Sequence, residues 1–303
     1  MLQACTLAVL AFGALIVVAG KGFVADPTEQ MKQAKQAMLA HRYDEAAAIY
    51  KGLIKALPNE PGLRFNLALA LHSSGQYREA IQELEAIQPA EQEKAKFWFL
   101  LGLGYLKLEQ PRKAIEPLRH AKELEPSNLD VRQELVAALL ASGYRTQEIA
   151  ELRDLVILSP ADRTIQAKLA KELWTSRNYE EAIPILESLV ATNQQQPDWQ
   201  FELGDALFAT GRVDDAIVHL RKAVELAPSL LPAHAKLGEA LLQAGESAAA
   251  IPHLEVAESL DADGSIHFEL ATAYRRVGKA ELASRALAQY KEIQKGPSSS
   301  RPD

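Results

Sequence analysis

Seven histidines and one short glycine motif are the residues of this sequence whose types could support catalysis or metal binding. The histidines stand at positions 41, 72, 120, 219, 234, 253 and 267, without the spacing of metal ligands on one helix face. We interpret them as ordinary surface or turn residues of helices. Gly102-Leu103-Gly104 resembles the start of a dinucleotide-binding loop, but a third glycine and a preceding strand are missing. No G-x-S-x-G, phosphate-binding loop or H-E-x-x-H motif occurs, so we expect no catalytic residue, metal, cofactor or small-molecule substrate.

The composition is that of a folded protein without a nucleic-acid-binding character. Hydrophobic residues make up 48% of the 303 residues, charged residues 24%, and aromatic residues only 6%. The formal net charge is -7, and no basic block provides a surface for nucleic acid. Cys5 is the single cysteine, which excludes a disulfide framework and a cysteine metal site.

The first part of the chain, residues 1–25, is predicted to be a signal peptide or an N-terminal membrane anchor. From Leu2 to Ala19 the residues are apolar or small except for Gln3 and Thr6. The apolar core and the small residues before Gly20 are typical of a cleaved signal, although the segment has no lysine or arginine. The same stretch of residues 2–19 is about the minimum length for a membrane tether, and a buried extra helix is a third interpretation. We expect the protein to be exported (periplasmic or secreted) or anchored in the membrane.

Small residues recur along the chain at a spacing of 34. One series is Ala46, Ala80, Ala114, Ala182, Ala216 and Ala250, with Glu148 in its gap and Ala283 one residue early. A second series is Ala34, Ala68, Gly102, Ala170, Gly204, Gly238 and Ala271, with Val136 as its exception. Prolines at 58, 126, 160 and 228 and glycines at 75, 143, 211 and 245 keep the same phase. The chain is therefore predicted to contain tandem repeats that begin at residues 27, 61, 95, 129, 163, 197, 231 and 264.

Each repeat is predicted to be a pair of helices. Large apolar residues occur at helical spacing, as in Leu67, Leu71, Ile81 and Leu84. The glycine lies between the two helices, where it supplies a positive φ, and the proline follows the second helix. The phased small residues mark the closest approach of paired helices, where a bulky side chain would overpack the interface.

These motifs resemble the tetratricopeptide repeat, whose pattern is W-x2-L-G-x2-Y, then A-x3-F, then P. Repeat 95–128 carries most of this pattern, in Trp98, Leu101, Gly102, Tyr105, Ala114, Leu118 and Pro126. The resemblance covers residues 26–295 and implies an all-α, right-handed α-solenoid. The polar residues 296–303 are expected to be a disordered tail.

Repeat 129–162 departs from the pattern at both close-packing positions, with Val136 and Glu148. Two interpretations remain open. Either the junction is splayed and softer, so that the array flexes there, or the register adjusts locally and Glu148 turns to solvent.

The resemblance implies a concave groove lined by the first helix of each repeat. The groove positions of the family are the second, fifth, ninth, twelfth and thirteenth of each repeat. The predicted partner-binding residues are Phe65, Leu69, Phe99, Leu103, Leu106, Trp174, Asp198, Phe201, Asp205, Phe208, Glu239, Leu242 and Phe268. The rings at the fifth position either anchor a ligand or pack between neighbouring first helices, whereas Trp174 and Phe208 favour ligand contact. Asp198, Asp205 and Glu239 are expected to form an acidic wall, which suits a partner with apolar anchors and some positive charge.

The sequence thus predicts a non-catalytic scaffold or adaptor that binds a protein or peptide partner in the cell envelope. One alternative is a structural protein that assembles into homo-oligomers through its terminal repeats. Another is an accessory subunit of an envelope enzyme or of a secretion or assembly complex.

Overall fold

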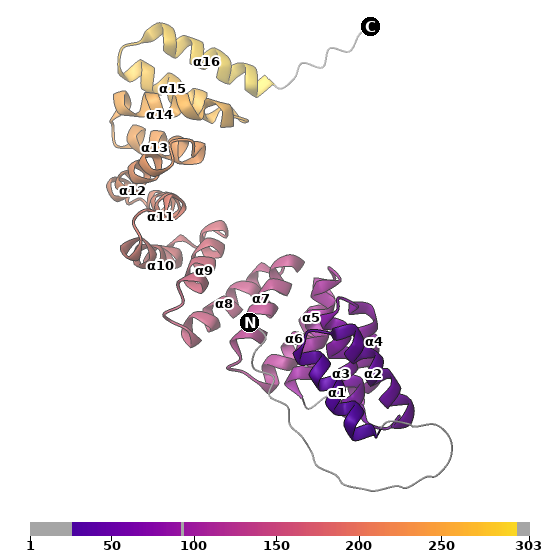
Figure 1. The fold of residues 1–303 in the computed structure, drawn as a ribbon. Coiled ribbons are helices and arrows are strands. Elements are labelled where there is room, and N and C mark those ends of the chain that lie inside the picture. Colours follow the sequence, from indigo (N-terminus) through magenta and orange to yellow (C-terminus); the bar gives the residue numbers. More distant parts are fainter. Residues whose placement is uncertain (1–25, 92–93, 296–303) are drawn as a thin grey trace, which may run out of the picture. The chain divides into compact units, whose positions relative to one another are not determined.

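The computed structural model describes residues 26–91 and 94–295 and consists of helices (Figure 1). The expected signal or anchor in residues 1–25 and the expected tail in residues 296–303 lie outside the described residues. The chain divides between residues 92 and 93 into two compact parts, and each part is described by itself. No strand occurs in the described ranges, and none of their helices has the length and hydropathy needed to cross a membrane.

Helices alternate with short turns throughout both parts. The first part contains α1 (Pro27–Leu39), α2 (Tyr43–Ala56), α3 (Pro61–Ser73) and α4 (Tyr77–Glu91). The second part contains α5 (Ala95–Lys107), α6 (Pro111–Leu124), α7 (Leu129–Ser142), α8 (Arg145–Leu158), α9 (Arg163–Thr175), α10 (Tyr179–Thr192), α11 (Pro197–Ala209), α12 (Val213–Leu226), α13 (Leu231–Gln243), α14 (Ser247–Ala257), the 3-10 turn η1 (Glu258–Leu260), α15 (Ser265–Arg276) and α16 (Ala280–Lys295). The odd-numbered helices begin at the expected first residue of each repeat, except that α15 begins one residue later. Within each part, consecutive helices pack on one another, and the predicted all-α solenoid of helix pairs is confirmed.

Capping residues define where many first helices begin. Proline is the first residue of α1, α3 and α11, where its missing N–H costs no helical hydrogen bond. The Asp162 carboxylate accepts from the backbone N–H groups of Thr164 and Ile165 at 2.9 and 3.2 Å, and so caps α9. The Asn128 side chain caps α7 in a similar way, by accepting from Val131 N at 3.2 Å.

Each first helix ends in a turn whose fifteenth repeat residue has a positive φ. Glycine occupies this position at 75, 143, 211, 245 and 278, as the sequence predicts. In the other three repeats His41, Glu109 and Arg177 adopt the same conformation, with φ between 56° and 61°. The next N–H then donates back to the carbonyl five residues earlier, for example from Gln76 to Leu71 at 2.8 Å. This hydrogen bond caps the C-terminus of the first helix in every repeat. It forms even at the three non-glycine residues, for which a left-handed backbone costs about 1–2 kcal/mol.

The phased glycines lie where the two helices of a repeat touch, as predicted. A Cβ atom added at Gly102 would lie 2.6 Å from Leu118 Cγ, and one at Gly204 would lie 2.7 Å from Leu220 Cγ. The same distance from Gly238 to Leu254 is 2.5 Å. The leucine of each second helix therefore fills the space that the missing side chain leaves.

A polar side chain at the fourth repeat position fastens each of several repeats to the loop before it. Its donor atom binds a carbonyl six residues earlier: Arg132 Nε to Pro126 at 2.6 Å, Gln166 to Pro160 at 2.8 Å, Gln200 to Gln194 at 3.1 Å and His234 Nε2 to Pro228 at 3.1 Å. The same residue often pairs with the second helix, as Gln200 does with His219 and Arg132 with Glu151. These bonds join the beginning of each such repeat to the end of the repeat before it.

Two histidines do not lie on the surface, contrary to the sequence interpretation. His234 and His267 are each 7% exposed. Because the Pro228 carbonyl can only accept, His234 donates through Nε2, and its Nδ1 accepts from His253 Nδ1 at 3.1 Å. Burial and the neighbouring His234 and Arg221 lower the pKa of His253. His234 thus joins the two helices of its repeat, whereas His267 binds Asp261, which precedes α15.

Candidate functional site

The best-defined candidate site is carried by the first helices α9, α11 and α13 of the second part. Neighbouring first helices touch each other, which places their outward-facing residues side by side. Residues that are 31 positions apart in the sequence meet across these helix pairs. We call the resulting set the first-helix surface; it comprises Lys171, Trp174, Phe201, Asp205, Phe208, Lys236 and Glu239.

Trp174 of α9 is the centre of the first contact. Its ring meets the ring of Phe201 on α11 edge to face, with centroids 5.7 Å apart, and its Nε1–H donates to Asp205 Oδ2 at 2.8 Å. The ammonium group of Lys171 lies 4.5 Å from the indole centroid, within the range of a cation–π interaction. All four side chains keep some exposed area, so the tryptophan is oriented but not enclosed.

Lys236 of α13 continues this surface from α11 to the next helix. Its Nζ donates to Glu239 at 2.7 Å, lies 3.7 Å from Asp205 Oδ1 and stands 5.5 Å from the Phe208 ring centroid. Burial lowers the pKa of Lys236, but the hydrogen bond and the charges of the two carboxylates outweigh it, and the pKa is raised. Lys236 is therefore cationic and bridges two helices.

Two further carboxylates flank this surface. Glu202 is 3% exposed and accepts from Lys171 Nζ at 2.6 Å; burial raises its pKa, and Lys171 opposes that rise. Burial and the charge of Glu239 raise the pKa of Glu269 to about 7, although Lys236 partly opposes this. Carboxylates thus outnumber the two lysines, and the surface favours cationic groups brought by a partner.

The structure brings together five of the predicted partner-binding residues: Trp174, Phe201, Asp205, Phe208 and Glu239. Asp198 is exposed at the beginning of α11. Leu242 is only 8% exposed and belongs to the core, so it offers a partner almost no surface. Phe268 is 52% exposed, and its ring packs against Tyr290 of α16 with centroids 5.4 Å apart.

The other predicted residues lie elsewhere on first helices. Phe99, Leu103 and Leu106 of α5 are half-buried, and Phe99 and Leu106 pack against the core of repeats 3 and 4. Phe65 and Leu69 are half-buried on α3, in the first part. Phe201 packs against Trp174 of the neighbouring first helix and Phe268 against Tyr290 of α16, and ligand contact by either ring stays a prediction.

The expected acidic wall needs a correction, because two of its three members are paired. Asp205 and Glu239 share Lys236, and Asp205 also binds the Trp174 indole. Sequence reasoning missed Lys236, Glu202 and Glu269. The available signal was the 31-residue offset, which aligns Lys171 with Glu202 and Asp205 with Lys236.

The arrangement is suited to binding. Its lysines are held by carboxylates, and its aromatic rings offer half-exposed apolar faces. In the described residues, no three histidine, cysteine, aspartate or glutamate side chains are grouped so that they could hold a metal ion.

Known proteins with the same repeat pattern match most of the chain. A family model described as tetratricopeptide repeat matches residues 62–229, and a second model with that description matches residues 231–255. No match was found among curated proteins.

Several solved structures are similar to this chain. MamA residues 41 to the end, from Desulfovibrio magneticus RS-1, is 22% identical, with 55% of this chain and 97% of that chain covered and a TM-score of 0.48. YrrB, described as a TPR protein with an unusual peptide-binding site, is 16% identical, with coverage of 67% and 96% and a TM-score of 0.49. The structure of Naa15/Naa10 bound to HypK-THB is 16% identical, with coverage of 90% and 42% and a TM-score of 0.64. At these identities the likeness concerns the fold alone.

Proposed function

Because the chain belongs to the tetratricopeptide repeat family, a family of protein-interaction scaffolds, we propose that it is a non-catalytic scaffold that holds a partner protein segment on its first-helix surface. The observation that carries this proposal is the continuity of that surface. Trp174, Asp205 and Lys236 link three successive first helices through side chains that each keep exposed area. A row of oriented, half-exposed aromatic and charged groups offers both apolar anchors and direction to a bound segment.

The charges of this surface indicate the chemistry of the partner. Asp198 is exposed, and burial together with the charge of Glu239 raises the pKa of Glu269. A lysine or arginine of a partner would relieve the repulsion between the two glutamates, and apolar side chains would cover Trp174 and Phe208. The partner segment is therefore a helix or extended peptide that combines apolar and basic residues.

We place this binding in the cell envelope, on the basis of the apolar run from Leu2 to Ala19. The test is expression of the full chain followed by fractionation of soluble, membrane and exported material. Recovery in the cytosol with an unprocessed N-terminus would contradict this assignment.

Quantitative affinity purification of the full-length tagged protein tests the binding surface. The groove variant combines Trp174→Ala, Phe201→Ala and Phe208→Ala. The matched control combines Ile157→Ala, Val218→Ala and Val256→Ala, which remove apolar groups that are 77%, 64% and 45% exposed on second helices. Circular dichroism confirms that both variants keep the helical content of the wild type.

We expect the wild type and the control to retain the same partner, and the groove variant to lose about tenfold or more of it. Equal retention by all three proteins would place binding elsewhere. Recovery of only the tagged protein together with its own untagged copies would favour self-assembly.

A further inference from the structure

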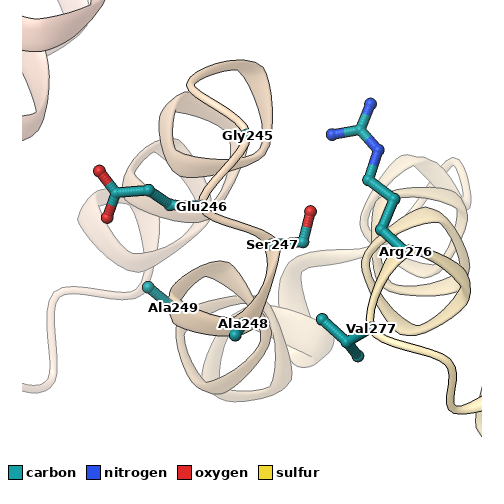
Figure 2. Close-up of a pocket in the computed structure, with 7 residues that line it drawn as sticks. All are labelled: Gly245, Glu246, Ser247, Ala248, Ala249, Arg276 and Val277. Carbon is teal, nitrogen blue, oxygen red and sulfur yellow. The ribbon is translucent and has the colours of Figure 1, made fainter.

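A second candidate site lies away from the first-helix surface, where the turn before α14 faces the end of α15. A hollow of about 650 Å³ opens there between Ser247 and Ala248 on one wall and Arg276 and Val277 on the other (Figure 2). Its walls belong to repeats 7 and 8 of the second part.

The hollow exists because Ser247 is small. It is the seventeenth residue of its repeat, the first residue of a second helix, and larger side chains occupy this position in the six repeats before it. These are Tyr43, Tyr77, Pro111, Arg145, Tyr179 and Val213. Serine at this position removes bulk and holds its hydroxyl group close to the backbone.

Three hydrogen-bond donors at this end of α14 have no acceptor among the described residues. The backbone N–H groups of Ser247 and Ala248 precede the first bonds of the helix, which Ala249 and Ala250 donate to the Glu246 carbonyl. Ser247 is 5% exposed, and its hydroxyl oxygen has no hydrogen-bond partner in the described part of the chain. A buried hydroxyl without a partner is unfavourable, so a ligand that accepts from it removes that cost. The partial positive charge of the helix N-terminus selects an anion.

Arg276 supplies the matching charge from the opposite wall. Its Nη1 donates to the Leu242 carbonyl at 2.8 Å, which fixes the side chain and leaves other guanidinium N–H groups for a ligand. At the same repeat position the other repeats carry Leu39, Ser73, Lys107, Ala141, Thr175, Ala209 and Gln243. The one nearby carboxylate, Glu246, binds Arg221 at 2.9 Å and points away from the hollow, whereas the Ser247 hydroxyl is turned toward the side of Arg276 (Figure 2).

We propose that this hollow binds a phosphate-type oxyanion, either inorganic phosphate or a phosphate monoester. A tetrahedral dianion accepts from several directions at once, which matches two backbone N–H groups, one hydroxyl and one guanidinium on facing walls. Arginine and serine appear together in this hollow and in no other repeat at these two positions.

Nuclear magnetic resonance of the full chain tests the proposal. Inorganic phosphate is added against potassium chloride of equal ionic strength, and the backbone amides of Ser247 and Ala248 are followed. N-acetyl-O-phosphoserine amide and acetate are titrated in parallel. The variants are Arg276→Gln and Ser247→Tyr, which restores the residue type of three other repeats. Arg275→Gln is the matched control, because it removes the same charge from the adjacent exposed residue.

We expect saturable shifts of both amides with phosphate, and affinity about tenfold weaker in the Arg276→Gln variant. The Ser247→Tyr variant keeps its fold and loses the shifts, while Arg275→Gln changes the affinity by about twofold or less. Tighter binding of the phosphoserine derivative would assign the site to a phosphorylated partner, and tighter binding of inorganic phosphate to the free ion. The proposal is overturned if acetate binds as well as phosphate, if the amides do not move, or if the two arginine variants behave alike.

Discussion

The junction between repeats 6 and 7 and the junction between repeats 4 and 5 have the same helix arrangement but carry chemically opposite residues. At the junction of repeats 6 and 7, α12 carries Ala216 at the twentieth repeat position. The next first helix, α13, carries Ala240 at the tenth repeat position, and both alanines are fully buried. At the second junction the same two positions hold Glu148 and Glu172. Alanine or glycine also occupies both positions at the junctions formed by Ala182 with Ala206 and by Ala250 with Ala273.

The two glutamates remain inside the junction. Glu148 is 2% exposed, and burial together with the carboxylate of Glu172 raises its pKa to about 7, although Arg145 opposes the rise. Glu172 Oε2 lies 3.3 Å from Arg145 Nε and has no hydrogen-bond partner in the described ranges. In the second part, α7 and α9 are also the neighbouring first helices with the least contact between them. The same arrangement of helices thus accommodates either two buried alanines or two neighbouring glutamates.

One of the two sequence interpretations of repeat 129–162 is therefore wrong in its account of Glu148. This side chain does not turn to solvent, because α9 covers it. The sparse contact between α7 and α9 agrees with a splayed junction, and flexing at that junction stays a prediction.

Transferring the glutamate to the apolar junction should have the largest effect. Ala216→Glu places a carboxylate among buried alanines without a counterpart of Arg145, and we expect a loss of about 3–5 kcal/mol in the free energy of unfolding. Urea denaturation measures it. Val218→Glu is the control, since Val218 is 64% exposed on the same helix. Similar losses of unfolding free energy in both variants would show that a carboxylate at the buried Ala216 position costs no more than one at the exposed Val218 position.

Exchanging the close-packing residue is expected to have the next largest effect. Gly204→Val introduces the residue type of Val136 where an added Cβ would lie 2.7 Å from Leu220 Cγ, and we expect a loss of about 1–3 kcal/mol. Gly52→Ala is the control, because nothing lies within 4 Å of a Cβ added there. If Gly204→Val is as stable as the wild type, repeat 6 can separate its helices as readily as repeat 4.

Neutralising Glu148 should remove a pH dependence from the other junction. With a pKa of about 7 in the folded state and an ordinary value of 4.5, the folded state binds the extra proton between these pH values. Its contribution to stability is therefore largest below pH 4.5, falls as the pH rises to about 7, and is constant above. Glu148→Gln cannot ionise, so we expect it to be more stable than the wild type by about 1–3 kcal/mol at pH 8 and similar to it at pH 5.

Glu269→Gln provides the comparison for that experiment, since burial and Glu239 raise the pKa of Glu269 to the same range. Unfolding curves at pH 5 and pH 8 for wild type and both variants separate the two contributions. A wild type and Glu148→Gln variant that respond alike to pH would show that Glu148 is ionised and stabilised in the junction.

The smallest expected difference concerns local opening of the helices. Amide hydrogen exchange should give opening free energies in α7, α8 and α9 about 1 kcal/mol lower than in α11, α12 and α13. Equal protection in the two sets would contradict a softer junction. The Ala216→Glu variant should reduce the difference by weakening the second set.

The repeat phase was predictable because close packing demands small residues at fixed positions, as Gly102 and Gly204 show. The turns were predictable where glycine supplies the positive φ, but His41, Glu109 and Arg177 adopt that conformation because the surrounding turn imposes it. Single-residue patterns cannot show such tertiary control of the backbone.

The candidate site was only partly predictable, for a similar reason. The aromatic members Trp174 and Phe208 follow from their repeat positions. Pairing across helices, as between Asp205 and Lys236, depends on how far one first helix slides past the next, and this is decided by packing. The hollow at Ser247 likewise results from one small residue facing a neighbouring repeat.

The main contacts within each part of the protein join helices that are consecutive or separated by one helix. No described core residue there needs a sequence-distant segment to become buried, so loop-closure entropy delays little of the folding. As the chain leaves the ribosome, each repeat can cover its predecessor's leucines once about 34 further residues have been made. Folding can therefore keep pace with synthesis, and a stop codon at a repeat boundary would leave a shorter array with one newly uncovered helix.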